Sequence, residues 1–182
     1  LGGAAMIAVD LDGTLLDYSP ESNSPRVNHA VINALVRRGV RHVAICTNQG
    51  GLPWHVMGVL RKDGRPYPSP AQFLNRLAVA VGALERYGIR VAAVRVCVYH
   101  PRADAGAIQR AATEVREGMT RSILVADWTV YTTARSRKPE PHVLLSLKRL
   151  WGEIEYWGDS PEDGEAALAA GVPFVPVERF FG

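Results

Sequence analysis

The chain has 182 residues, a formal net charge of +3 and an isoelectric point of about 9.1. Hydrophobic residues make up 47% of the chain, which excludes a disordered protein, and no apolar run approaches the roughly 20 residues that a membrane-spanning helix needs. The mild basic excess is compatible with an anionic ligand or a nucleic acid but identifies neither, because an excess of this size is common on protein surfaces. The length predicts one domain that spans residues 1–182.

The chain begins with Leu1-Gly2-Gly3-Ala4-Ala5 and not with Met, and it lacks the basic segment and long apolar stretch of a secretory signal. Both cysteines, Cys46 and Cys97, lie in apolar runs that are typical of strands. We interpret them as buried, reduced thiols and not as a disulfide framework. These features predict a cytoplasmic protein without a membrane segment, and they leave the oligomeric state open.

The first predicted strand, residues 6–9, is followed at once by Asp10-Leu11-Asp12-Gly13-Thr14. Residues i and i+2 of a strand share a face, so Asp10 and Asp12 would aim at one ligand if the extended geometry persists. Carboxylates are hard oxygen ligands that suit Mg²⁺, and a glycine lets the backbone turn closely around a ligand. The alternative is that Asp, Gly and Thr only form a turn here.

The middle of the chain alternates between helical and strand patterns. Ser24-Pro25 and Ser69-Pro70 each combine a helix cap with a proline that suits the first helical position. The predicted elements are a helix from Pro25 to Gly39, a strand at 40–46 that stops at Thr47-Asn48-Gln49-Gly50-Gly51, a segment at 52–68 that is mostly loop, a helix at 71–87 and a strand at 91–99.

The region 103–133 is interpreted as an insertion or loop of uncertain form. Residues 107–117 have helical composition, while 122–126 and 129–133 have strand-like composition with Trp128 between them. The rest of the chain predicts a helix opened by Pro139 and Pro141, a strand at 154–157 that ends at Gly158-Asp159-Ser160-Pro161-Glu162-Asp163, a helix at 165–170 and a strand at 172–177.

This alternation of strands and helices predicts an α/β fold, a Rossmann-like parallel sheet with helices on both faces. Ligands of such sheets bind beyond the carboxyl ends of the strands. Three predicted strands end in polar clusters, at residues 10–14, 47–51 and 158–163. We therefore expect these three clusters to converge on one crevice.

The aspartates suit phosphoryl transfer. A carboxylate can attack phosphorus and form an aspartyl-phosphate, which water then hydrolyses. Asp10 would be the nucleophile, and Asp12 would act as general acid and then as general base. Asp159, and with it Asp163, would complete or orient the shell of a Mg²⁺ ion.

The transferring phosphoryl group also needs hydrogen-bond donors and positive charge. Thr47 offers a hydroxyl, backbone amides near Asp12 and Asn48 offer N–H groups, and Lys138 offers an ammonium. The alternative for Lys138 is a solvated basic loop before a helix.

In this order, Asp10-x-Asp12-Gly13-Thr14, Thr47-Asn48, Lys138-Pro139, and Gly158-Asp159-Ser160 with Asp163 resemble the four motifs of the haloacid dehalogenase (HAD) phosphatase superfamily. The resemblance spans nearly the whole chain and implies a Rossmann-like sheet, Mg²⁺ dependence and an aspartyl-phosphate intermediate. It also implies that Thr47 and Lys138 bind phosphate, and that the Asp10 side chain, the Asp12 carbonyl and Asp159 contact the metal.

Between the first two motifs there is room for a loop and one helix only, so a cap domain is not expected there. Residues 47–51 and 137–141 resemble the small capless branch, which includes histidinol-phosphate and heptose-bisphosphate phosphatases and the 3′-phosphatase part of polynucleotide kinase. In the sugar enzymes of this branch the arginine before the lysine helps to hold substrate, which implies that role for Arg137. The sugar and histidinol enzymes commonly carry a zinc loop of three cysteines and a histidine, whereas here only Cys97 and His100 remain, so no zinc is expected.

The expected function is Mg²⁺-dependent hydrolysis of a phosphate monoester of a small metabolite. One alternative is a 3′-phosphatase on DNA or RNA ends, since an open site admits a strand. Another is a non-catalytic phosphate- or nucleic-acid-binding module, which would not need a second aspartate as a proton shuttle. His100 and Trp54 are interpreted as structural, although a tryptophan can also stack on a base or a sugar.

Overall fold

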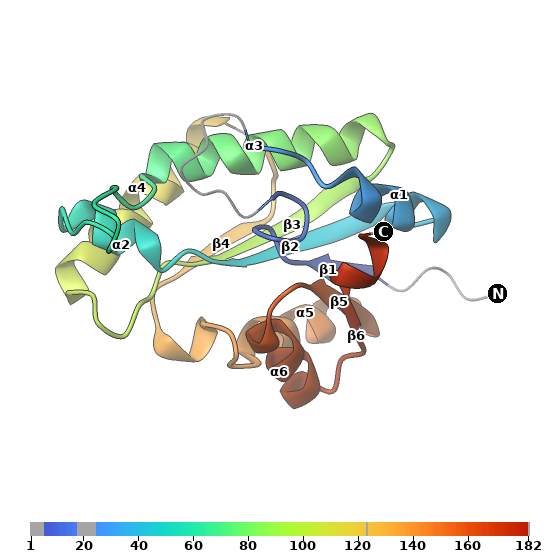
Figure 1. Ribbon diagram of the computed structural model, residues 1–182. Helices are drawn as coiled ribbons and strands as arrows, with labels where there is room; N and C mark the ends of the chain where they lie inside the picture. The colour runs from blue at the N-terminus through green and yellow to red at the C-terminus, as the bar shows by residue number, and fades with distance from the viewer. Residues whose placement is uncertain (1–5, 18–24, 123, 182) are drawn as a thin grey trace.

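A computed structural model describes residues 6–17, 25–122 and 124–181. Within these ranges the strands form one six-stranded sheet in the order β4-β3-β2-β1-β5-β6, and every neighbouring pair is parallel (Figure 1). This confirms the predicted α/β fold. The strands are β1 Met6–Val9, β2 His42–Asn48, β3 Arg90–Cys97, β4 Trp128–Tyr131, β5 Ile154–Gly158 and β6 Phe174–Pro176.

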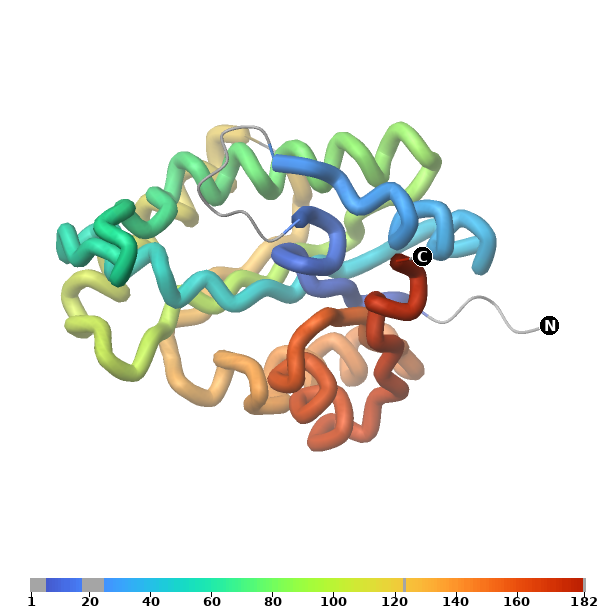
Figure 2. Tube along the Cα trace, in the orientation of Figure 1, coloured from blue at the N-terminus to red at the C-terminus, as the bar shows by residue number. Residues whose placement is uncertain are grey.

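Helices cover both faces of the sheet. Helices α1, α3 and α4 lie on one face and α5 and α6 on the other (Figure 1). The last turn, η2, lies beside α1 (Figure 2). Its Phe180 stacks on Trp157 with the ring centroids 5.0 Å apart. The helices are α1 His29–Arg37, α2 Gly51–Val56, α3 Pro70–Arg86, α4 Ala105–Ser122, α5 His142–Trp151 and α6 Pro161–Ala170, with 3₁₀ turns η1 Ala134–Ser136 and η2 Val177–Phe180.

The apolar core follows this layering. One cluster of buried side chains includes Val31, Phe73, Leu77 and Val115 from α1, α3 and α4, and a second includes Leu144 from α5. Both cysteines are buried free thiols, as predicted, and burial raises the pKa of each. Among the described residues, no helix combines the length and the apolar character that a bilayer-spanning segment requires.

Two helices begin at a serine cap. Ser69 before α3 and Ser160 before α6 each accept a hydrogen bond from the backbone N–H three residues later, and the side chain of that residue accepts from the cap's own N–H. The Ser69-Pro70 prediction is therefore confirmed. Helix α6 starts at Pro161, four residues earlier than predicted, because Ser160 caps it there.

The helix predicted to begin at Pro25 is wrong at its start. Ser24 lies outside the described residues, and α1 begins only at His29. Val27 pairs with Leu16 in an antiparallel bridge, so the chain at 25–28 stays extended against the loop that follows β1.

The segment 52–68, predicted to be mostly loop, begins as the short helix α2. The rest of it is a turn that a bridge between Leu60 and Pro66 closes, with the Arg61 N–H donating to the Arg65 carbonyl at 2.8 Å. The loop interpretation is correct for residues after Val56 and wrong before it.

Most of the region 103–133 is regular structure, and its helical composition at 107–117 and strand-like composition at 129–133 are confirmed by α4 and β4. Helix α4 fills residues 105–122 because Ala111, Val115 and Met119 recur at helical spacing on its buried face. Strand β4 follows and pairs with β3, with Trp128 inside it and not before it. The strand predicted at 122–126 is wrong, since Ser122 ends α4.

Candidate active site

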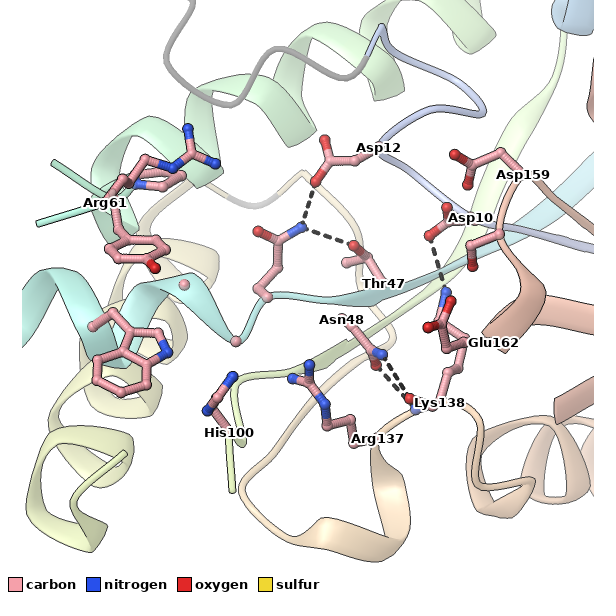
Figure 3. Close-up of a pocket in the computed structure, with 17 residues that line it drawn as sticks. Asp10, Asp12, Thr47, Asn48, Arg61, His100, Arg137, Lys138, Asp159 and Glu162 are labelled. Carbon is pink, nitrogen blue, oxygen red and sulfur yellow. Dashed lines mark hydrogen bonds and ion pairs between the residues drawn. The ribbon is translucent and has the colours of Figure 1, made fainter. Parts of the chain in front are cut away.

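The carboxyl ends of the central strands surround one cavity of about 440 Å³ (Figure 3). Asp10 follows β1, Thr47 and Asn48 end β2, and Asp159 follows β5, so the predicted convergence of three polar clusters is confirmed. The other residues that line the cavity are Asp12, Gln49, Gly50, Gly51, Trp54, Arg61, Tyr67, Pro68, His100, Arg137, Lys138, Ser160 and Glu162.

Lys138 lies at the centre of a buried polar cluster. Its Nζ donates to Asp10 Oδ1 at 3.0 Å and to Asp163 Oδ1 at 2.6 Å, and it lies 2.7 Å from the Tyr156 hydroxyl and 3.1 Å from the Cys46 carbonyl. The side chain is only 8% exposed. Lys138 is therefore not part of a solvated basic loop.

The charges of this cluster support one another. Burial lowers the pKa of Lys138, but the Asp10 and Asp163 carboxylates outweigh burial and raise it above its usual value. For Asp163 the effects have the opposite sign. Burial raises its pKa, but Lys138 and the hydrogen bonds from Tyr156 and Ser160 outweigh burial and hold this pKa below its usual value. The pKa of Tyr156 is raised well above normal by burial and by Asp163, so its hydroxyl keeps its proton and donates to Asp163 Oδ1 at 2.7 Å.

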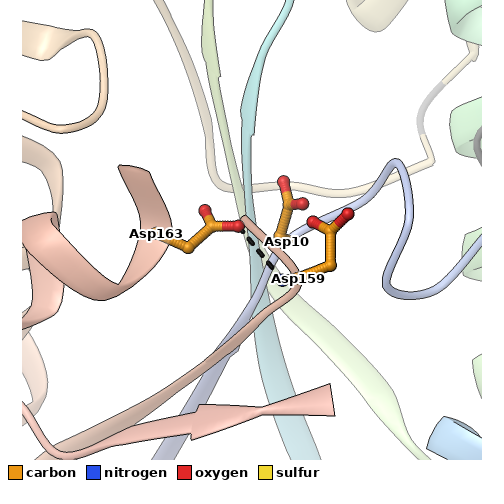
Figure 4. Close-up of side chains that lie close together, drawn as sticks. All are labelled: Asp10, Asp159 and Asp163. Atoms are coloured by element: carbon orange, nitrogen blue, oxygen red, sulfur yellow. Dashed lines mark hydrogen bonds between the residues drawn. The ribbon is translucent and has the colours of Figure 1, made fainter. Parts of the chain in front are cut away.

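Asp163 ties the loop of Asp159 to this cluster. Its Oδ2 accepts from the backbone N–H groups of Asp159 and Ser160, both at 3.2 Å, and from the Ser160 hydroxyl at 2.9 Å (Figure 4). Both oxygens of Asp163 thus already accept hydrogen bonds. Asp163 is better placed to orient its neighbours than to coordinate an ion directly.

The carboxylates fit a divalent cation. Oxygens of Asp10, Asp159 and Asp163 all lie within 4.8 Å of one another (Figure 4). Asp10 and Asp163 contact the Lys138 ammonium and Asp159 lies beside them, so a divalent cation would balance the negative charge that Lys138 leaves. An all-oxygen donor set with one or two direct carboxylates is the set that Mg²⁺ prefers.

Loss of solvent contact disfavours the charged forms of Asp10 and Asp159. It raises the pKa of Asp10 to about 8, in spite of Lys138, and it raises the pKa of Asp159. Gly13 has φ +80°, and a Cβ at this position would overlap Asp159 Oδ2. Glycine therefore lets the turn after β1 come close to the Asp159 carboxylate.

Asp12 lines the same cavity but has its own partners (Figure 3). Its Oδ1 forms an ion pair with Arg76 of α3, and its Oδ2 accepts from Gln49 Nε2 at 2.9 Å. Gln49 Nε2 also donates to Thr47 Oγ1 at 2.8 Å. These contacts fix the Asp12 carboxylate beside Thr47.

Asn48 and Arg137 hold the loop around Lys138. The Asn48 side chain accepts from the Lys138 backbone N–H and donates to the Lys138 carbonyl, both at 3.1 Å. Arg137 Nη1 donates to the Tyr99 carbonyl at 2.8 Å. The Asn48 side chain thus positions Lys138.

Three residues of the site did not emerge from sequence reasoning: Arg76, Gln49 and Tyr156. For Arg76 a signal exists, because it occupies the same helix face as the buried Phe73, Leu77 and Ala80. A charged side chain on a buried face requires a partner. The sequence contains no comparable signal for Gln49 or Tyr156.

No protein-family model and no curated protein matches the sequence. Among solved structures, the chain is similar to D,D-heptose 1,7-bisphosphate phosphatase from B. bronchiseptica in complex with magnesium and phosphate, with a TM-score of 0.58 and 20% identity over 93% of this chain and 78% of that one. It also matches a hydrolase from Streptococcus pneumoniae TIGR4, with a TM-score of 0.39 and 18% identity over 97% and 96% of the two chains. The first match shows a shared fold, and the second carries no argument at this score.

Proposed function

We propose that the protein is a Mg²⁺-dependent phosphomonoesterase that acts on a small metabolite through an aspartyl-phosphate at Asp10. The observation that carries this proposal is the Asp10 carboxylate, which is buried against the Lys138 ammonium at 3.0 Å and lies beside the Asp159 carboxylate in the cavity. An ion pair with a purely structural role would not need a further carboxylate, that of Asp159, at the mouth of a cavity. The fold that the chain shares with a phosphatase crystallised with magnesium and phosphate supports the same reaction.

Asp10 and Asp159, with the Asp12 carbonyl, would hold the Mg²⁺ ion. Bound there, the ion would screen the repulsion between the Asp10 carboxylate and the phosphate. An Asp10 oxygen then forms a bond to phosphorus while the ester oxygen leaves with a proton from Asp12. Asp12 next takes a proton from water, whose oxygen bonds to phosphorus and releases inorganic phosphate from Asp10.

The remaining residues would bind and orient. Thr47 and Lys138 donate to the oxygens of the phosphoryl group as charge develops on them. Asn48 and Asp163 hold Lys138 in place. Arg137, at the rim of the cavity, contacts the leaving group.

The test is hydrolysis of p-nitrophenyl phosphate by the purified protein. We expect hydrolysis with Mg²⁺, none with EDTA, and a loss of at least a thousandfold in kcat for Asp10→Asn. Asp104→Asn is the matched control: the residue is exposed outside the cavity, so activity should be unchanged. Wild-type protein that binds phosphate but remains inert with Mg²⁺ would favour a binding module.

The second candidate, a 3′-phosphatase on nucleic-acid ends, is separated by substrate and salt. A 3′-phosphorylated oligonucleotide should be a poorer substrate than small phosphate esters. A strong preference for the oligonucleotide that falls steeply with salt concentration would replace the first proposal by the second.

A further inference from the structure

The end of the cavity away from Asp10 is built from aromatic rings. Trp54 contacts Tyr67 with the ring planes 25° apart and the centroids 6.2 Å apart, and it meets His100 edge-on at 5.1 Å. Figure 3 shows Arg61 and His100 across the cavity from Asp10 and Asp159. We call Trp54, Tyr67 and His100 the aromatic wall.

Local contacts hold this wall in place. Trp54 lies on α2, and the neighbouring His55 Nδ1 hydrogen-bonds the Tyr67 carbonyl at 2.8 Å, which fixes the end of the following loop. The Arg61 guanidinium lies over the Tyr67 ring, 5.5 Å from its centroid. The aromatic wall is therefore formed without a ligand.

The three rings remain partly exposed, so a ligand can still cover them. Burial, together with Arg137 and Arg102, lowers the pKa of His100, which makes this ring neutral at physiological pH. Gly50 lets Arg137 and His100 pack close to the backbone, because a Cβ there would run into Arg137 and lie 3.2 Å from the His100 ring.

The size and chemistry of the cavity indicate what it holds besides phosphate. Its volume of about 440 Å³ lies in the range of small-molecule sites, roughly 300–1,000 Å³, and is more than a phosphate group alone requires. A second phosphate would need cations aimed into the cavity. Arg61 instead lies over the Tyr67 ring, and the Tyr99 carbonyl holds Arg137 between His100 and Lys138, nearer to the proposed leaving group (Figure 3). The aromatic wall therefore adds flat ring faces to the otherwise polar lining of this end.

Resting on the proposed function, we propose that the aromatic wall binds a nucleobase, so that the substrate is a nucleoside monophosphate. In this arrangement the phosphate lies at Asp10 and the base stacks on Trp54. The ribose lies between them, beside Gly50. Stacking on aromatic side chains suits every base, because each has a π face. The wall then selects for a planar ring and not for one particular base.

The test compares adenosine 5′-monophosphate with ribose 5-phosphate, which lacks only the base. Binding is measured by calorimetry with Mg²⁺ and the Asp10→Asn variant, in which turnover does not interfere. We expect adenosine 5′-monophosphate to bind at least tenfold more tightly, and a Trp54→Leu substitution in this background to remove most of that difference. Trp151→Leu is the matched control, because Trp151 lies on α5 outside the cavity and should leave the ratio unchanged.

Equal binding of the two ligands, or an equal weakening of both by Trp54→Leu, would overturn the inference. Uridine 5′-monophosphate should share the preference, since stacking tolerates any base. Hydrolysis of p-nitrophenyl phosphate by wild-type protein separates the two proposals. If the protein hydrolyses p-nitrophenyl phosphate but binds the two ligands equally, only the base-binding role of the aromatic wall is rejected. If binding shows the preference for the base but no hydrolysis occurs, the phosphatase proposal is rejected.

Discussion

Asp10 links the ionisation of the site to the stability of the protein. In the folded, metal-free protein its pKa is raised by burial from 3.8 to about 8. Between these values the folded state binds a proton that the unfolded state has lost, so the free energy of unfolding falls as the pH rises through this window. A cation that binds the carboxylate reverses this trend and releases the proton.

We therefore expect metal-free wild-type protein to lose stability relative to Asp10→Asn as the pH rises from about 4 to about 8. Urea unfolding of both proteins at several pH values measures the difference in their free energies of unfolding. The contributions of the other titrating groups cancel in this difference. Saturating Mg²⁺ should restore the stability of the wild-type protein near pH 8. Parallel stability curves for the two proteins would contradict this account of Asp10.

Arg76 and Asp12 form a pair whose arginine is almost fully buried, at 2% exposure. Removing one partner of a buried ion pair typically costs about 3–5 kcal/mol, because it leaves a charge without compensation. Arg76→Met should accordingly lower the free energy of unfolding by about 3 kcal/mol. It should also lower kcat more than it raises KM, since Asp12 is proposed to move protons and not to bind substrate.

A double variant tests this coupling. Asp12→Asn should recover part of the stability that Arg76→Met loses, because the uncompensated carboxylate is gone. The control is Arg38→Met, which breaks the exposed pair with Glu155 and should cost no more than about 1 kcal/mol. Additive losses for Arg76→Met and Asp12→Asn would show that the two residues are not coupled.

Single residues differ in how readily the sequence reveals them. Asp10 and Asp159 follow predicted strands and Lys138 directly precedes a predicted helix, and each of them lies close to a Gly or Pro, which makes it conspicuous. Arg76 and Tyr156 lie inside elements, and their importance depends on what the fold packs against them. The sequence therefore pointed to the acidic groups, to Lys138 and to Asp163 as an orienting group, but not to Arg76 or Tyr156.

At the scale of elements, α6 and α3 share one N-terminal motif but differ in their relation to the site. The Ser160 hydroxyl caps α6 and donates to Asp163 Oδ2, whereas Ser69 caps α3 outside the cavity. Losing a serine cap typically costs about 1 kcal/mol. Ser160→Ala and Ser69→Ala should therefore destabilise the protein by similar amounts, about 1 kcal/mol each.

Their effects on catalysis should differ. Ser160→Ala also loosens Asp163, and through it Lys138, so we expect kcat for p-nitrophenyl phosphate to fall several-fold. Ser69→Ala should leave kcat unchanged. Thermal unfolding and steady-state kinetics on the two variants measure both effects, and an equal loss of kcat in both would argue against a positioning role for Asp163.

Elements set by local signals were predicted, and those set by tertiary contacts were not. Helix α3 has its cap, its proline and its apolar face within one stretch of sequence. The same Ser-Pro signal at residues 24–25 does not start a helix at Pro25, because Val27 pairs with Leu16 across the turn after β1. The strand-like composition at 129–133 did indicate β4, but the bounds of this four-residue strand, Trp128–Tyr131, are set by its pairing with β3.

At the scale of the whole molecule, the strand order determines where the chemistry lies. Strand β1 lies between β2 and β5, so the loops after these three strands meet at the point where the strand order reverses. Ligands of open α/β sheets bind at such a point. Parallel strands ending in polar clusters were enough to predict this meeting point, although the strand order itself was not predicted.

The central claim is that Asp10 takes the phosphoryl group onto its own side chain. Acid-quenched mass spectrometry during turnover with Mg²⁺ tests this most directly, by locating any phosphate carried by the protein. The account predicts a phosphate on the peptide that contains Asp10, absent from Asp10→Asn and accumulating in Asp12→Asn where water is no longer activated. Steady hydrolysis with no phosphate on the protein, or with phosphate on another residue, would contradict it.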